Sequence, residues 1–303
     1  MTASRAIGVD LGGTKILAGV VDRDGLVDRR ESCPTPVSSQ DELFAALDEV
    51  VERLLGDDVG AVGFGIPSMI DQRSGRALHS IHVPLADVDF RDRMADRFGL
   101  PVGIDNDGNA AAVAEWRLGA GRGTSTLVVL TLGTGIGGGL ILDGRPFRGS
   151  IGAGAELGHM VLQYGGPPCG GNCTGHGHFE ALASGSAADA LARRRYGAGA
   201  DARRLVDAAR GGDDGAVEDL AHVGRRLGAG IASLVNIFNP EVVVVGGGFA
   251  DAAELILDPA AETMRAEALR PLLDVRVVPA ELGAEAGMIG AALIGFEALD
   301  SRS

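Results

Sequence analysis

Short apolar runs alternate with glycine-rich or polar turns along the first part of the chain. Residues 6–10 and 16–21 are apolar runs separated by a glycine turn and followed by an Asp-Gly pair, which is the pattern of a β-hairpin. From Leu43 to Leu55 apolar residues recur at helical spacing, and Ser39 with Glu42 forms a capping box at the start of the predicted helix. Beyond it the pattern predicts a buried strand, a helix, a short strand and an alanine-rich helix, at 59–66, 92–98, 101–104 and 109–118.

An internal repeat follows. The segment VDLGGTKILAGVVD, which starts at Val9, is similar to LTLGTGIGGGLILD, which starts at Leu130, at an ungapped offset of 121 residues that places Asp22 on Asp143. Each copy has a strand, a glycine turn, a second strand and an Asp turn. The repeat therefore predicts two related lobes, with chance similarity between two glycine-rich hairpins as the alternative.

The second half of the chain continues with mixed elements. A long helix is predicted over 216–238, and Asn239-Pro240 ends it. A buried strand over 242–245 leads into three glycines, and a strand over 275–279 precedes a final helix from Met288. The order of hairpin and β/α units, given twice, predicts an α/β fold with mixed sheets and outer helices.

Composition and charge exclude several classes of protein. Of the 303 residues, 46% are apolar and 22% charged, which excludes a disordered or fibrous chain. The net charge of −14 argues against nucleic acid or an anionic membrane as the main partner. No apolar run has the roughly 18 residues of a membrane helix, and the start of the sequence lacks the apolar core of a signal peptide. We therefore expect a soluble, cytoplasmic protein, in which three cysteines form no disulfide framework.

The glycine turns are candidates for phosphate binding. Gly133, Gly135 and Gly138 match the dinucleotide fingerprint, but the pattern after them predicts a strand instead of the required helix, so a nicotinamide site is excluded. No P-loop motif is present. A glycine turn between two strands exposes backbone N–H groups to phosphate oxygens, and the turn occurs twice, with a third glycine run before a helix. Two ordinary hairpin turns are the alternative.

Five motifs in this order resemble the ROK family (repressor, open reading frame, kinase), and within it the bacterial ROK glucokinases. They are DLGGTK at 10–15, DNDGN at 105–109, LGTGIGGG at 132–139, ELGH at 156–159 and VGGG at 245–248. The resemblance implies a two-lobed, duplicated actin/hexokinase-like (RNase H-like) fold with an interlobe cleft. The expected N-terminal lobe is 1–115 joined by a C-terminal helix at about 289–303, and the C-terminal lobe is 116–288. Because the sequence begins at the first kinase strand, we do not expect the added DNA-binding segment of ROK repressors.

The resemblance also implies the roles of particular residues. Asp107 is the expected general base, although its position before a helix also fits a simple N-cap. The residues expected to bind the sugar are Gly65, Asn106, Asp107, Glu156, His159 and Glu180. The residues expected to bind ATP and its phosphates, with Mg²⁺ at Asp10, are Asp10, Gly12, Gly13, Thr14, Lys15, Gly133, Thr134, Gly135, Gly137, Gly247 and Gly248. Asp105 stands where the family often has Glu, and no role is assigned to it.

A cluster of cysteines and histidines departs from the zinc motif of the family. One cysteine of that motif is replaced by His178 and another is shifted to Cys169, but two cysteines with two histidines still suit a tetrahedral Zn²⁺. The expected ligands of this structural zinc, in the loop 159–180, are His159, Cys169, Cys173 and His178. His176 is the alternative fourth ligand, and a loop without metal is the other alternative.

The expected function is ATP- and Mg²⁺-dependent phosphorylation of a hexose, from D-glucose to glucose 6-phosphate. Kinases for an N-acetylhexosamine or for fructose, and a non-catalytic sugar sensor, are the alternatives. Ser68 and His82 differ from what the family often has, so 67–69 and 80–85 are the segments expected to select the sugar. Polyphosphate in place of ATP also stays open, and the resemblance implies a homodimer or a dimer of dimers.

Overall fold

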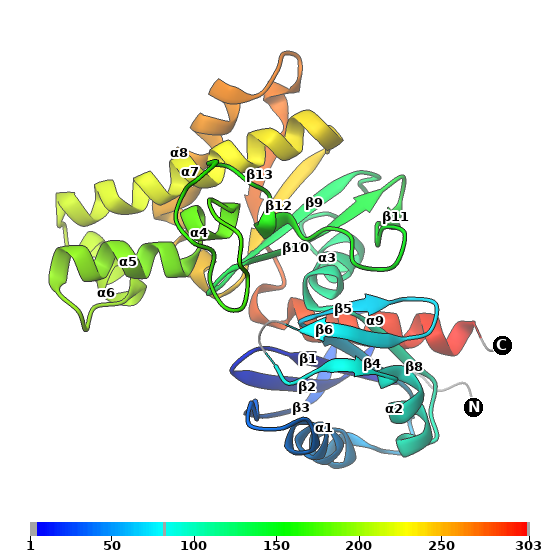
Figure 1. Cartoon of the computed structure of the whole chain (residues 1–303). Coiled ribbons are helices and arrows are strands. Elements are labelled where there is room, and N and C mark those ends of the chain that lie inside the picture. The colour runs from blue at the N-terminus through cyan, green and yellow to red at the C-terminus, as the bar shows by residue number, and fades with distance from the viewer. Residues whose placement is uncertain (1–4, 81–82, 302–303) are drawn as a thin grey trace.

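The computed structural model describes residues 5–80 and 83–301 and shows two lobes, each built on a five-stranded sheet (Figure 1). The strand order of the N-terminal sheet is β3-β2-β1-β4-β8. Its strands are β1 (Arg5–Leu11), β2 (Lys15–Asp22), β3 (Val27–Pro34), β4 (Val59–Ile66) and β8 (Val102–Asn106). The first three strands are antiparallel, whereas β4 and β8 run parallel to β1.

The C-terminal sheet repeats this arrangement, with the strand order β11-β10-β9-β12-β13. Its strands are β9 (Leu127–Leu132), β10 (Ile136–Leu142), β11 (Arg145–Pro146), β12 (Val242–Gly246) and β13 (Arg276–Pro279). Again three antiparallel strands are followed by two parallel ones. The predicted duplication, with its strands, glycine turns and Asp turns, is therefore present in the fold.

The strand register corrects the ungapped alignment by one residue. In the first hairpin Ala6 pairs with Val21, and in the second Leu127 pairs with Ile141. The offset between the copies is thus 121 residues before the glycine turn and 120 after it. The second turn is one residue shorter, so Asp143 lies one position beyond the equivalent of Asp22.

Helices cover both faces of each sheet, so the central strands are buried on both sides. α1 (Gln40–Leu54) and α2 (Phe90–Phe98) cover one face of the N-terminal sheet, and α9 (Ala286–Asp300) packs on the other. The C-terminal lobe adds a further set of helices: α4 (Phe179–Ala183), α5 (Gly185–Tyr196), α6 (Ala202–Arg210), α7 (Asp214–Phe238) and α8 (Ala253–Glu267). Every residue of β4 and β12 is buried, which explains their continuous apolar sequences.

One helix, α3 (Asp107–Leu118), lies between the two sheets (Figure 1). Its small side chains allow a close approach to β10. A methyl group on Gly108 would lie 2.5 Å from the carbonyl oxygen of Gly138, and one on Gly139 would lie 2.6 Å from Cβ of Ala112. The alanine-rich sequence of α3 thus reflects a contact between the lobes, with no space for larger residues.

The chain crosses between the lobes after α3 and again before α9, and one carboxylate binds both crossings. Glu115 is 1% exposed. Its carboxylate accepts hydrogen bonds from the backbone N–H of Ala120 (2.9 Å) in the first crossing and of Glu281 (3.2 Å) and Leu282 (2.8 Å) in the second. Charge-assisted bonds to backbone donors are among the stronger ones in proteins, so Glu115 holds the two crossings together.

The predicted elements agree with the structure within a few residues, and the omissions concern weakly patterned segments. The edge strand β3 was missed because half of its side chains are exposed and several are charged. The small antiparallel sheet of β5 (Ser68–Asp71), β6 (Arg76–Ser80) and β7 (Ala86–Val88) was missed as well. The described residues also contain four 3₁₀ turns: η1 (Leu157–His159), η2 (Gly248–Ala252), η3 (Leu272–Asp274) and η4 (Gly283–Glu285). Within 5–80 and 83–301, none of the helices combines the length and apolar character that crossing a bilayer requires.

Candidate active site

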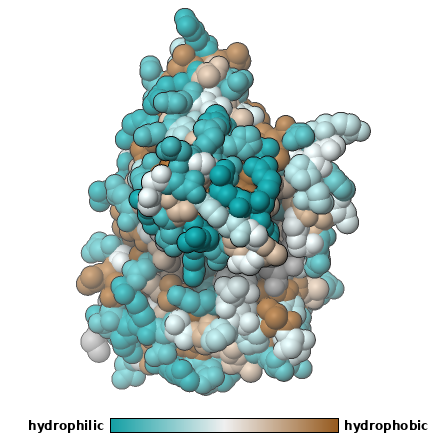
Figure 2. Space-filling view, turned by 90° about the vertical axis from the view of Figure 1, so that its left-hand side faces the viewer, coloured by the Kyte–Doolittle hydropathy of each residue, from teal (hydrophilic) through white to brown (hydrophobic). Residues whose placement is uncertain are grey.

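A pocket of about 550 Å³ lies between the two lobes. Segments from both lobes line it, including the loop after β4, the start of α3, both glycine turns, η1 and the start of α4. The pocket-lining residues are Gly13, Thr14, Pro67, Ser68, Met69, His79, Asn106, Asp107, Thr131, Leu132, Gly133, Thr134, Gly135, Ile136, Gly137, Gly138, Ala155, Glu156, His159, Glu180, Gly247 and Gly248. Figure 2 shows the surface of one side of the molecule, which is largely hydrophilic.

Both glycine turns are closed by a backbone hydrogen bond. The N–H of Gly12 donates to the carbonyl of Lys15, and that of Gly133 donates to the carbonyl of Gly135, each at 3.0 Å. The third glycine run, at 246–248, packs against Leu132, the residue before the second turn. Gly247 has φ of +89°, and a methyl group on it would overlap the backbone of Leu132, so only glycine fits there. Residues of three glycine-containing segments thus line one pocket, an arrangement suited to anions.

Asp107 is the first residue of α3, and Asn106 is its N-cap. The side-chain oxygen of Asn106 accepts hydrogen bonds from the N–H groups of Gly108 (2.9 Å) and Asn109 (3.3 Å). The N-cap of α3 is therefore Asn106, although Oδ1 of Asp107 also accepts a hydrogen bond from the N–H of Gly108 (2.9 Å). Asp107 lines the pocket, and the helix N-terminus favours its ionised form.

A second carboxylate lies near Asp107, at the end of β1. The pKa of Asp10 is raised to about 7, mainly by burial and then by the negative charge of Asp107, while Lys15 opposes the rise. Asp10 also packs against the start of α9, where a methyl group on Gly287 would lie 2.7 Å from its carboxyl carbon. Two carboxylates that repel one another in a partly buried space favour a cation between them.

Glu156, His159 and Glu180 line the pocket from the C-terminal lobe. Glu156 precedes the turn η1 and His159 ends it, so both lie on one side of that turn. Burial raises the pKa of Glu156 above its usual value; His159 lowers it, and the carboxylates of Asp107 and Glu180 add to the rise. Glu180 also accepts a hydrogen bond from the N–H of Ile136 (3.2 Å), which ties it to the second glycine turn.

Four side chains next to the pocket have the geometry of a tetrahedral metal site. The ligand atoms of His159, Cys169, Cys173 and His178 all lie within 4.8 Å of one another. The two Nδ1 atoms are 3.2 Å apart, and the nitrogen–sulfur distances are 3.7 Å for His159 to Cys169 and 3.6 Å for His178 to Cys173. A tetrahedron with ordinary zinc bond lengths has edges of about 3.4 Å between nitrogens and about 3.6 Å between nitrogen and sulfur. The donor set and its spacing therefore fit Zn²⁺.

His176, the alternative ligand, is exposed and is not part of this group. The sulfur of Cys169 also donates to Oε1 of Glu180 at 2.8 Å. Through this contact the cluster is joined directly to a residue that lines the pocket. A bound ion would take the place of the thiol proton and so break this contact; its link to the pocket wall would be His159, which lines the pocket itself.

The structure brings most of the predicted site residues together. Of the residues predicted to bind sugar or nucleotide, four do not line the pocket, namely Gly65, Asp10, Gly12 and Lys15. Gly65 lies under the start of α3, where a methyl group would be 3.5 Å from Cα of Asp107. His82 lies outside the described residues. No signal in the sequence pointed to His79 and Thr131, which only the folding of separate strands brings to the pocket.

The fold and the site define the class of this chain: it is a sugar kinase with the two-lobed fold of actin and hexokinase. The sequence model of the ROK family matches residues 6–297, and the chain belongs to that family. It is 37% identical over 312 residues to a glucokinase of Thermotoga maritima, covering 97% of this chain and 98% of the relative. It is 34% identical over 312 residues to a glucokinase of Streptomyces coelicolor, covering 96% of this chain and 97% of the relative.

A solved structure agrees with these sequence relatives. The ROK family glucokinase from Streptomyces griseus, in complex with glucose and AMPPNP, is similar with a TM-score of 0.88 and 35% sequence identity. The match covers 97% of this chain and 99% of that one. The predicted family and the predicted two-lobed fold are both confirmed.

Proposed function

We propose that this chain transfers the γ-phosphoryl group of ATP to a hydroxyl group of a hexose, converting D-glucose to glucose 6-phosphate. The observation that carries the proposal is the pocket, which is lined both by Asn106-Asp107 and Glu156 and by the glycine turns. Phosphoryl transfer needs a positioned hydroxyl, a base and a phosphate cradle in one place. The names of the two relatives and the glucose and AMPPNP in the Streptomyces griseus structure support the same reaction.

Asp107 accepts the proton of the attacking sugar hydroxyl in this proposal. A base must be ionised and within hydrogen-bond reach of that hydroxyl, and the N-terminus of α3 favours the ionised form. Asn106 uses its side-chain oxygen as a cap, which leaves the amide nitrogen to donate to a sugar hydroxyl. The carboxylates of Glu156 and Glu180 accept hydrogen bonds from the remaining hydroxyl groups, and the imidazole of His159 accepts or donates one.

The glycine turns hold the nucleotide phosphates through their backbone N–H groups, with Thr14 and Thr134 adding hydroxyl donors and Lys15 a charge. Asp10 would hold Mg²⁺, which supplies neutralisation of charge on the transferred phosphoryl group. A cation bound there would favour the charged form of Asp10, which burial opposes.

The four side chains His159, Cys169, Cys173 and His178 would hold a structural Zn²⁺ with no position left open for water. Bound there, the ion supplies a rigid cross-link within the loop 159–180. His159 faces the cluster with Nδ1, so Nε2 remains for a sugar hydroxyl. Because the ligand set includes a pocket residue, the ion and the sugar site are mechanically joined.

The test measures ATP consumption with Mg²⁺ against D-glucose, D-fructose, D-mannose and the N-acetylhexosamines. We expect glucose to give the highest kcat/KM, and Asp107→Asn to lower kcat by about 10²-fold or more. Asp24→Asn, which changes an exposed carboxylate in the turn after β2, is the matched control and should keep wild-type turnover. Sugar binding without ATP consumption would identify a sensor, and a higher kcat/KM for an N-acetylhexosamine or fructose would replace glucose as the substrate.

A further inference from the structure

A fully buried carboxylate directly precedes the proposed catalytic pair. Asp105 is 0% exposed. Its Oδ1 accepts hydrogen bonds from the N–H of Asn106 (2.9 Å), from Nδ2 of Asn109 (3.0 Å) and from Nε2 of Gln72 (3.1 Å). Its Oδ2 accepts from Nε of Arg148 at 2.6 Å, which makes a buried ion pair. The proposed reaction uses neither member of this pair.

The two members of the pair come from different lobes. Asp105 belongs to β8 in the N-terminal lobe, whereas Arg148 follows β11 in the C-terminal lobe. The segment 148–156 starts at Arg148 and ends at Glu156, which lines the sugar side of the pocket. The segment also touches the N-terminal lobe at Gly152, which packs so closely against the carbonyl oxygen of Ile70 that a side chain would overlap it.

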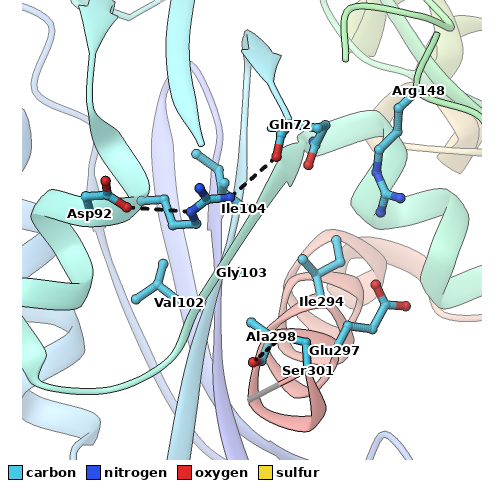
Figure 3. Close-up of a pocket in the computed structure, with 11 residues that line it drawn as sticks. Gln72, Asp92, Val102, Gly103, Ile104, Arg148, Ile294, Glu297, Ala298 and Ser301 are labelled. Carbon is cyan, nitrogen blue, oxygen red and sulfur yellow. Dashed lines mark hydrogen bonds and ion pairs between the residues drawn. The ribbon is translucent and has the colours of Figure 1, made fainter. Parts of the chain in front are cut away.

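Arg148 is reached from a second cavity that shares no lining residue with the active-site pocket. This cavity has a volume of about 490 Å³ and lies beside β8, between α2 and α9. Figure 3 shows Arg148 extending into it from the other lobe, across from Glu297. The side chain of Arg148 is 25% exposed, whereas that of Asp105 is not exposed at all. A small cation in this cavity could therefore approach the carboxylate if the arginine side chain were removed.

We propose that the Asp105–Arg148 pair is a positioning pair that holds the segment carrying Glu156 in register with the strand that ends at Asn106-Asp107, and so sets the affinity for the sugar. This inference rests on the proposed function. Burying an ion pair gives little net stability compared with apolar residues of the same size, because desolvation offsets the attraction. A charge-assisted bond does, however, fix distance and direction between its partners. The pair joins the two walls of the sugar site, where a small displacement has a large effect on binding and rate.

The first experiment separates positioning from stability with Arg148→Ala and the double variant Asp105→Asn/Arg148→Ala. We expect Arg148→Ala to raise the KM for D-glucose about tenfold and to leave the KM for ATP within about twofold, because the glycine turns that would hold the nucleotide lie outside the segment 148–156. The double variant carries no uncompensated buried charge, so its Tm should exceed that of Arg148→Ala. Its KM for glucose should nevertheless stay raised. A double variant with the wild-type KM would overturn the proposal, because the pair would then only balance charge.

The second experiment is chemical rescue with guanidinium chloride at concentrations below those that unfold the protein. In Arg148→Ala the ion should enter the cavity, pair with Asp105 and lower the KM for glucose toward the wild-type value. The double variant, which lacks the carboxylate, should show no rescue. Arg91→Ala is the matched control, because Arg91 lines the same cavity but donates to the carbonyls of Gln72 and Arg73 and not to Asp105. Absence of rescue in folded Arg148→Ala would count against a positioning role.

Hydrogen–deuterium exchange gives a readout that does not depend on turnover. Exchange over 149–159 should rise in Arg148→Ala and fall again with guanidinium, while exchange in α1 stays unchanged. If the wild-type protein phosphorylated no sugar, the proposed function would be refuted, but the exchange data would still test whether the pair holds the segment. Unchanged exchange over 149–159 would refute the positioning pair even in an active enzyme.

Discussion

The contact between α3 and β10 allows a steric test of how closely the lobes must fit. In Gly108→Ala the added methyl group would lie 2.5 Å from the carbonyl oxygen of Gly138, against 3.4 Å for an ordinary contact, so the two elements must separate by 0.9 Å. Gly108 follows Asp107, and Gly138 lies in the strand after the second glycine turn. A displacement of this size between base and phosphate cradle should lower kcat by about 10²-fold.

The protein should still fold, because overpacking costs about 1–3 kcal/mol, which is less than the total stability of a typical domain. Alanine is also the better helix former, so any loss of stability would be steric. The assay compares kcat for glucose phosphorylation and Tm with those of Gly199→Ala, where a methyl group meets nothing within 4 Å. Wild-type kcat in folded Gly108→Ala would show that the approach of the lobes is not limiting, and the reasoning would fail.

Three further predictions concern metal, pH and the crossings between the lobes. Cys169→Ser, or a strong chelator, should remove zinc, raise the KM for the sugar and lower Tm; metal analysis that finds no zinc in active protein would contradict this. Burial raises the pKa of Glu156, so its carboxylate becomes protonated at a higher pH than an ordinary carboxyl group. As the pH falls, the KM for the sugar should therefore begin to rise at that higher pH. Glu156→Gln should make the KM for the sugar less dependent on pH. Glu115→Ala should lower the free energy of unfolding by about 2–4 kcal/mol in urea titrations, because three backbone N–H groups lose the buried carboxylate that accepts their hydrogen bonds.

The local pattern of the sequence determined most of the elements and the duplication. Ser39 and Glu42 predicted the start of α1, where the hydroxyl of Ser39 accepts the N–H of Glu42, and Asn239 ends α7 in the left-handed conformation. These features depend on neighbouring residues, which the sequence displays directly. The edge strand β3 and the sheet β5–β7 pair with strands that are adjacent in the chain, but they were missed because β3 carries several exposed charged side chains and β5, β6 and β7 are short, which leaves little hydrophobic pattern.

The same distinction applies to the site. Asp107, Glu156 and the glycine turns belong to short motifs, so their residue types and order already indicated phosphoryl transfer. The sequence assigned no role to Asp105 and did not point to Arg148 or Glu115, because each acts through partners that are far away in the chain. The choice of Asn106 as the cap also required coordinates, whereas His178 was already the predicted fourth member of the cluster, with His176 as the alternative. A motif records the chemistry of neighbours, whereas contacts between lobes depend on how the whole chain packs, and only the tertiary structure determined those.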